Sequence, residues 1–350
     1  MAANGAVSAT SVNDLTRPAD SGAAGSIAAP RRVAAVEIPT LLITLLAYGG
    51  WSAVTLMYGR WPLWLVAPVG AVLVTLHGSL QHEIVHGHPT RWGRINRLLA
   101  MVPLSIWLPF DSYRVSHLAH HVDERLTDPL DDPESWYWTA EDWARLSPLS
   151  RAVVHISQTL AGRVTIGAFW TIGRYLRGEW RALLANREGA RAMWLEHLLW
   201  CIPVICWVQV VCGMPLWLYM LTIAIPGTGI TLIRSFAEHR ARPAVRGRIA
   251  LVEESWILGP LFLFNNLHAL HHEAPWVPWY EYPARYRCIR ERLILENGGL
   301  VYRTYFDVAW RFLLRPHDSP LHPTGRVPTR ASWDLRRAAG SPQPSPRDPR

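Results

Sequence analysis

The stretch PTLLITLLAYGGWSAVTLMY, residues 39–58, carries no formally charged side chain. Because about 20 apolar residues in a helix cross the hydrocarbon core of a bilayer, this stretch predicts a membrane span. A second span is predicted at 61–80, WPLWLVAPVGAVLVTLHGSL, and only Gly59 and Arg60 separate the two. The pair should therefore form a tight hairpin whose outer ends face the same side of the membrane.

A second hairpin is predicted in the middle of the chain. Residues 198–233 form another uncharged run, which CGMP at 212–215 interrupts. Glycine and proline favour a turn, so two spans fit this run better than one very long helix. Uncharged runs of this length are uncommon in soluble helical proteins, which argues against that class. We therefore expect an all-α integral membrane protein with four transmembrane helices in two hairpins.

Arginines indicate the orientation of these spans. They precede the first hairpin at 31–32 and follow the two hairpins at 91–97 and 234–248, whereas the predicted tips hold only Arg60. Positive residues collect on the cytoplasmic side of membrane proteins. We therefore expect a multi-pass inner (cell) membrane protein with both termini, and the segments 82–192 and 239–350, in the cytoplasm.

The two ends of the chain differ in composition from its middle. Residues 1–34 are rich in Ala, Ser and Gly, and residues 315–350 are rich in Pro and Arg. Such segments bury too little apolar surface to offset the entropy of ordering them. We therefore expect a disordered leader at 1–34, one membrane domain at 35–314, and a disordered tail at 315–350.

Histidines are concentrated directly after the predicted spans and after short apolar segments. The clusters are HEIVH, HLAHH, EH and HALHH, which contain His82 and His86; His117, His120 and His121; His239; and His268, His271 and His272. Spacings of three and four residues let one face of a helix present several imidazoles inward. Clustered imidazoles repel one another when protonated, so these repeated clusters predict a bound metal.

Nine imidazoles exceed the four to six ligands that one first-row metal ion takes, so the count predicts two ions. Imidazole suits iron, zinc, copper or nickel, and the spacing does not choose among them. His77 and His88 flank the first cluster, and His77 offers a competing partner for His82. The cysteines at 201, 206, 212 and 288 include no C-x-x-C pair, which argues against a disulfide framework, a cysteine zinc site or a built-in iron–sulfur cluster.

The order of hairpin, HEIVH, HLAHH, hairpin, EH and HALHH resembles the membrane fatty acid desaturase and hydroxylase superfamily, over residues 36 to about 290. This resemblance implies a cytoplasmic helical cap that carries the histidine boxes and holds a non-haem di-iron centre. Two iron ions would activate dioxygen, the co-substrate, to attack an unactivated C–H bond. The nine clustered histidines named above would be the ligands. The first box departs from many acyl desaturases, because three residues, not four, separate His82 from His86.

Residues near the boxes are candidates for supporting roles. Some relatives hold a metal-bound water with an asparagine, and Asn265 or Asn266 would take that role here. Nearby acids could accept the second ring N–H of a ligand and fix its tautomer, or be solvated surface charges. These acids are Glu83, Asp123, Asp128, Glu238 and Glu273.

Other functional classes explain fewer of these residues. HEIVH also matches H-E-x-x-H, the signature of zinc metalloproteases, but a membrane protease would leave most of the clustered histidines without a role. A carboxylate-bridged di-iron bundle requires Glu-x-x-His on two helices, and this chain contains that pattern once, at Glu83 and His86. A metal transporter would place its ligands near the middle of the bilayer, whereas these histidines follow the predicted spans and are expected at the membrane edge.

The expected substrate is a fatty acyl chain, because LTDPLDDPES at 126–135 and PWVPWYEYP at 275–283 resemble bacterial acyl desaturases. A hydroxylase or ketolase acting on a carotenoid or an alkyl chain is the alternative, since the same ligands serve all these reactions. The chain lacks a nucleotide fingerprint or a cysteine cluster for electron transfer, so electrons should come from a ferredoxin or similar carrier and its reductase. The net charge of +8 would suit an acidic partner or anionic lipid, or reflect positive-inside bias. No nucleic acid is expected as a partner.

Overall fold

The computed structural model of the chain describes residues 35–323, which are mostly helical. Four helices within this range are long and apolar enough to cross a membrane, which confirms the predicted spans. They are α1 (Ile38–Leu56), α2 (Leu63–Val85), and the continuous stretches Ala190–Val211 and Leu216–Glu238. The expected leader at 1–34 lies outside the described residues. The description extends past the expected domain boundary at 314, and His317 is buried.

The third and fourth spans each contain a π-helical turn. The third consists of α9 (Ala190–Cys206) and η3 (Trp207–Val211), and Gly213 ends it in the left-handed conformation. The fourth consists of α10 (Leu216–Tyr219), η4 (Met220–Ala224) and α11 (Ile225–Glu238). Proline lacks an amide N–H and its ring crowds the carbonyl four residues earlier. The wider turns beside Pro203 and Pro226 accommodate these two prolines within the spans.

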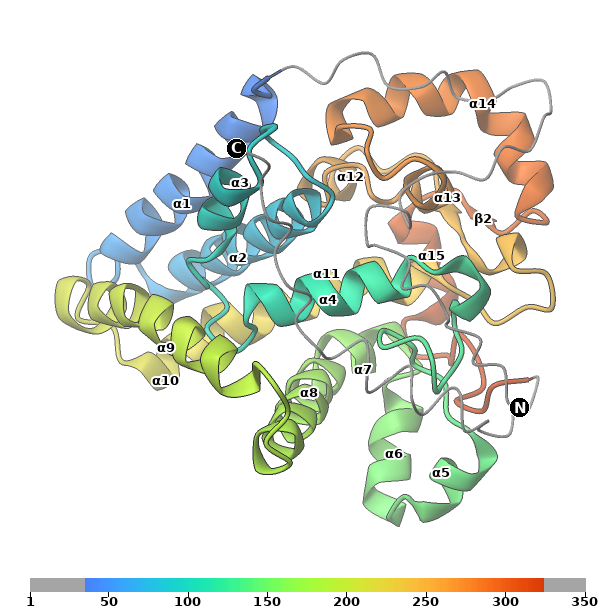
Figure 1. The fold of residues 1–350 in the computed structure, drawn as a ribbon, viewed down its shortest axis with the longest axis horizontal. Coiled ribbons are helices and arrows are strands. Elements are labelled where there is room, and N and C mark those ends of the chain that lie inside the picture. Colours follow the sequence, from blue (N-terminus) through green and yellow to red (C-terminus); the bar gives the residue numbers. More distant parts are fainter. Residues whose placement is uncertain (1–34, 324–350) are drawn as a thin grey trace, which may run out of the picture. The chain divides into compact units, whose positions relative to one another are not determined.

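Small residues let the helices of the two hairpins approach closely. Helix α2 packs on α1 and on α11, and Figure 1 shows α1 and α2 side by side. A Cβ atom added to Gly227 would lie 2.9 Å from the carbonyl oxygen of Ala71 and 2.8 Å from Val74. The hydroxyl of Thr75 donates to the Gly227 carbonyl over 2.9 Å. Membrane helices associate through such close packing and interhelical hydrogen bonds.

The segments between and after the spans form short helices and one small sheet. Between the hairpins lie α3 (Gly93–Ala100), α4 (Phe110–His120), η2 (Asp123–Arg125), α5 (Ala140–Arg145), α6 (Pro148–Ile156), α7 (Leu160–Val164) and α8 (Ile166–Leu184). After the fourth span come η5 (Arg246–Arg248), β1 (Leu251–Val252), α12 (Leu258–Leu261), α13 (His268–Glu273), η6 (Trp279–Glu281), α14 (Tyr282–Glu296), β2 (Val301–Tyr302) and α15 (Tyr305–Phe312). Strands β1 and β2 are parallel, with Leu251 opposite Val301.

These elements bring the histidine segments to the ends of α2 and α11. Helix α4 packs on the end of α2, and α13 packs on β1, which pairs with β2 in the small sheet. The stretch after α11 turns back on itself, because Ala250 N–H donates to the Glu238 carbonyl and His239 bridges to Ile249. Helices α12, α13, α14 and α15 lie together, away from α9 and α10 (Figure 1).

Replacing Gly227 with Ala should destabilise the contact between α2 and α11. The added methyl group would overlap backbone on α2, and overpacking of this kind costs about 1–3 kcal/mol. We expect a lower midpoint of thermal unfolding in detergent, measured by size-exclusion chromatography after heating. Gly173→Ala on α8 is the matched control, because within residues 35–323 no atom from outside its own helical turns lies within 4 Å of the added Cβ. Equal midpoints for the two variants would contradict the close packing.

Candidate metal centre

The nine clustered histidines lie in two groups. In each group, one ring nitrogen per residue lies within 4.8 Å of the corresponding nitrogens of the others. The five-histidine group consists of His82, His86, His117, His121 and His271, and the four-histidine group consists of His120, His239, His268 and His272. All nine side chains are buried or partly buried. The structure therefore brings together every histidine that the sequence singled out as a ligand.

Each H-x-x-H-H box contributes to both groups. From α4, His117 and His121 join the five-histidine group, whereas His120 joins the four-histidine group. The box of α13 shows the reverse division: His268 and His272 belong to the four-histidine group, and His271 belongs to the five-histidine group. Consecutive residues on a helix point about 100° apart, so neighbouring histidines diverge while residues four apart share a side. We expected one helical face to present the imidazoles of a box inward. Instead, the three rings of each box are divided between two faces of the helix.

The inward-facing nitrogen atoms have the spacing of ligands to a common ion. The Nε2 atom of His117 lies 3.1 Å from those of His86 and His121. In the other group, the Nε2 atom of His239 lies 2.9 Å from those of His120 and His268. Two nitrogen atoms bound to one ion at about 2.1 Å and at right angles would lie about 3.0 Å apart. The donor set therefore fits two first-row metal ions.

Acceptors on the outer side of the rings determine which nitrogen faces inward. Glu134 accepts from His117 Nδ1 over 3.0 Å, and Asp132 accepts from His120 Nδ1 over 2.9 Å. Tyr282 donates its own hydroxyl proton to the Ala274 carbonyl, so its oxygen accepts from His271 Nδ1 over 2.9 Å. A neutral imidazole that donates from Nδ1 carries its lone pair on Nε2. Lone pairs that converge within about 3 Å repel, so the arrangement calls for a cation.

Asp132, Glu134 and Tyr282 were missed as partners of the histidines. The sequence argument considered acids next to the boxes, whereas these residues lie 12, 17 and 11 positions away from their partners. A turn brings the two acids back, because Asp132 Oδ2 accepts from Thr127 N–H and its Oδ1 accepts from Glu134 N–H. The available signal was the acid-rich stretch LTDPLDDPES at 126–135 and the tyrosine in PWVPWYEYP at 275–283.

Two arginines, Arg163 and Arg174, pack against Trp136 next to this acidic turn. The guanidinium of Arg163 lies 3.4 Å from the ring centroid of Trp136, and that of Arg174 lies 5.8 Å from it. A guanidinium over an indole face is attracted by the ring quadrupole. Arg174 also donates to the Ser135 carbonyl. Trp136 is thus fixed two residues after Glu134.

Asn265 and Glu238 lie within about 3.2 Å of histidine nitrogens, and Glu83 Oε1 lies 3.7 Å from His82 Nδ1. Asn265 donates from Nδ2 toward His82 Nε2 over 3.2 Å, and its Oδ1 accepts from His268 Nδ1 over 3.0 Å. It therefore joins the two groups. Glu238 lies 3.2 Å from His268 Nδ1 and also pairs with Arg234 over 2.9 Å.

The remaining candidates have other contacts. Asn266 donates to the Val252 carbonyl, Glu83 accepts from Trp279 N–H, and Asp128 accepts from Leu130 N–H. Glu273 forms an ion pair with Arg292. His77 hydrogen-bonds Tyr48, and His88 hydrogen-bonds Glu37. The side chain of Asp123 lies outside the described residues.

Burial determines the protonation state of most of the clustered histidines that lie outside the membrane spans. Burial, followed by repulsion from neighbouring imidazoles, holds the pKa values of His121, His271 and His272 well below the ordinary range. These rings are therefore neutral at pH 7, the protonation state in which an imidazole can bind a metal ion. Burial also acts on His120, but the carboxylates of Asp132 and Glu134 outweigh it and raise the pKa to about 9. A carboxylate partner raises the basicity of a metal-binding histidine in this way.

Comparison with known families gives one match. A family described as fatty acid desaturase matches residues 59–306, which include all nine clustered histidines. A comparison with curated proteins found no match.

Replacing Asp132 with Asn should weaken metal binding by the four-histidine group. The amide can present its NH2 to His120 Nδ1 and so reverse the tautomer, and loss of such a partner typically lowers metal affinity about 10- to 100-fold. We expect a lower metal content after dialysis against a chelator, measured by inductively coupled plasma mass spectrometry. Glu124→Gln, an exposed change in the same segment, is the control. Unchanged metal retention in both variants would contradict the role given to Asp132.

Proposed function

Because the chain belongs to the fatty acid desaturase family, we propose that it uses dioxygen and two iron ions to introduce a double bond into a fatty acyl chain. The family makes the protein a membrane oxidoreductase of the desaturase and hydroxylase type. Desaturation, the acyl substrate and the iron are the parts that we propose. The division of nine histidines into two adjoining groups is the observation that carries the proposal.

The five-histidine and four-histidine groups would each hold one ion. Imidazole donors suit iron as well as zinc, copper and nickel, and the family favours iron. When bound, the iron pair supplies the reductive activation of dioxygen that breaks an unactivated C–H bond. A site built for one zinc ion and a general base would use His82, Glu83, His86 and at most one further histidine. It would leave the four-histidine group without a role, so we do not favour a protease.

Neighbouring residues would orient the metal-binding histidines and exclude water from the site. Asp132, Glu134 and Tyr282 fix the tautomers of three ligands, and Asn265 spans the two groups. His268 and His271 are fully buried, so bulk water has little access to this part of the site. Exclusion of water prevents side reactions of reactive intermediates.

The proposal includes partners and an orientation. The acyl substrate comes from the membrane, and electrons come from a separate ferredoxin or similar carrier and its reductase. The histidine groups lie at the ends of α2 and α11 that carry flanking arginines. By the positive-inside rule, these ends and both termini face the cytoplasm. A hydroxylase or ketolase would use the same ligands, and the product distinguishes it.

The product test compares lipids from cells that express the chain together with a ferredoxin and its reductase. We expect acyl chains lighter by two hydrogen atoms, detected by mass spectrometry of extracted lipids. A gain of one oxygen atom, or an altered carotenoid, would overturn desaturation in favour of the alternative. His271→Ala should abolish the new species, because His271 is a fully buried member of the five-histidine group. His155→Ala, an exposed change on α6, should leave it intact.

The orientation can be tested by cysteine labelling. Cys288 on α14 is exposed, and Arg60 is exposed at the tip between α1 and α2. In a background without other cysteines, a membrane-impermeant maleimide should label Cys288 in inverted vesicles only. Arg60→Cys, in a chain lacking Cys288, should be labelled from the opposite side. The reverse pattern would contradict cytoplasmic placement of the metal centre.

A further inference from the structure

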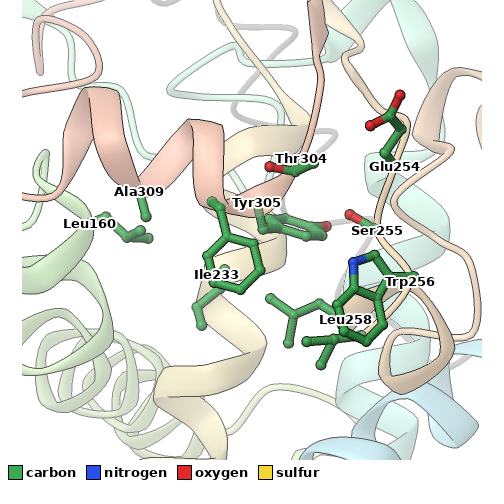
Figure 2. Close-up of a pocket in the computed structure, with 11 residues that line it drawn as sticks. Leu160, Ile233, Glu254, Ser255, Trp256, Leu258, Thr304, Tyr305 and Ala309 are labelled. Atoms are coloured by element: carbon green, nitrogen blue, oxygen red, sulfur yellow. The ribbon is translucent and has the colours of Figure 1, made fainter.

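A hollow of about 200 Å³ lies beside the fourth span. Figure 2 shows Ile233 of α11 on one side of it and Tyr305 and Ala309 of α15 on the other, with the segment 254–258 closing it. Most of the lining is apolar, including Leu160 and Leu258. The hollow is smaller than the sites that enclose whole drug-sized ligands, so it fits a segment of a longer molecule.

Two hydroxyl groups within this lining have no hydrogen-bond partner among the residues that the structure describes. Among the described residues, no group hydrogen-bonds Tyr305 OH or Ser255 Oγ, although both oxygen atoms are buried. The Tyr305 side chain is itself buried, with 5% of its surface exposed. In Figure 2 the Tyr305 hydroxyl points toward Ser255. Leaving a buried hydroxyl without a hydrogen-bond partner is unfavourable, so a bound molecule that offers an oxygen acceptor would be stabilised here.

The rim of the hollow is an exposed apolar surface outside the four spans. Trp256 and Phe306 are 77% and 70% exposed, and Trp310 on the next turn of α15 is 90% exposed. Large exposed apolar patches mark interaction sites, and tryptophan prefers the membrane interface. The rim adjoins Ile233, which belongs to the fourth span. Continuity with a membrane-spanning helix identifies the bilayer as the source of the occupant.

A series of contacts leads from the fourth span beside the hollow to the four-histidine group. Ile233 precedes Arg234, whose guanidinium pairs with Glu238, and Glu238 contacts His268 Nδ1 over 3.2 Å. Burial, followed by the negative charge of Glu238, raises the pKa of Tyr305 well above its usual range. The Tyr305 hydroxyl is therefore protonated and can donate a hydrogen bond.

We propose that this hollow binds an acyl segment of a membrane phospholipid, with Ser255 and Tyr305 donating hydrogen bonds to an ester carbonyl oxygen. The chain enters from the bilayer between α11 and α15. This inference rests on the proposed function in one respect: both take a membrane lipid as the molecule that the protein binds. The binding itself is measurable without turnover.

The test uses the full-length, metal-loaded protein in phosphatidylcholine nanodiscs that contain a photoactivatable phosphatidylcholine with a diazirine in its acyl chain. After illumination, labelled peptides are quantified by mass spectrometry. We expect labelling of the segments 254–258 and 304–309. Ala309→Phe should fill the hollow and lower this labelling at least about tenfold, whereas Ala144→Phe, an exposed change on α5, should not.

The hydroxyl pair is tested by conservative changes. Tyr305→Phe keeps the ring and should lower labelling about three- to tenfold, the effect of losing one neutral hydrogen bond. Ser255→Ala should act similarly, and Tyr175→Phe on α8 is the matched control. An ether-linked probe, which lacks the ester carbonyls, should label the wild type and Tyr305→Phe equally. Equal labelling of these two proteins by the ester probe would overturn the role of the hydroxyl.

Metal content measured on the same samples separates this inference from the proposed function. A protein that retains two iron ions but is labelled elsewhere, or is unaffected by Ala309→Phe, would overturn the lipid site alone. Labelling of the hollow that depends on Ala309 and Tyr305 would support the lipid site even in a preparation that binds no iron. That second result would count against the proposed function only.

Discussion

Nine ring nitrogens converge in two small volumes, and the rest of the structure serves to hold them there. Neutral imidazoles with lone pairs about 3 Å apart repel, and protonated ones repel more strongly. A cation at the centre of each group would remove this repulsion, and acceptors hold the outer nitrogens in place. Asp132, Glu134, Tyr282 and Asn265 supply those acceptors from segments distant in sequence. The folding of the segments outside the spans and the binding of metal should therefore be strongly coupled.

The membrane helices provide the rigid base for this arrangement. His82 lies on the last turn of α2 and His239 directly follows α11, and these two helices are locked together by Gly227 and Thr75. His86 follows α2, and the other six histidines lie on α4, directly after it, and on α13. Helix α4 packs on α2, and β1, which follows the turn after α11, packs on α13. A shift of either hairpin would therefore displace histidines of both groups.

The features that depend on local composition could be predicted from the sequence. Four apolar runs gave four spans, and the clustering of histidines identified every member of both groups. The partners of the rings could not be predicted in the same way, because Glu134 reaches His117 only after the chain has turned through 127–135. The division of each box also escaped sequence reasoning. Spacing defines which residues share a helical face, but where two sites lie around that helix depends on what packs against it. Similarly, Glu273 stands next to His272 in sequence but pairs with Arg292.

The pairs His120–His121 and His271–His272 each join the two groups through a single peptide unit. Consecutive Cα atoms are about 3.8 Å apart, and this distance is covalent and does not stretch. The separation of the two histidine groups is thereby limited by bond lengths. Bilayers of different thickness can tilt the spans and alter access to the site, yet the spacing between the two groups should stay nearly the same.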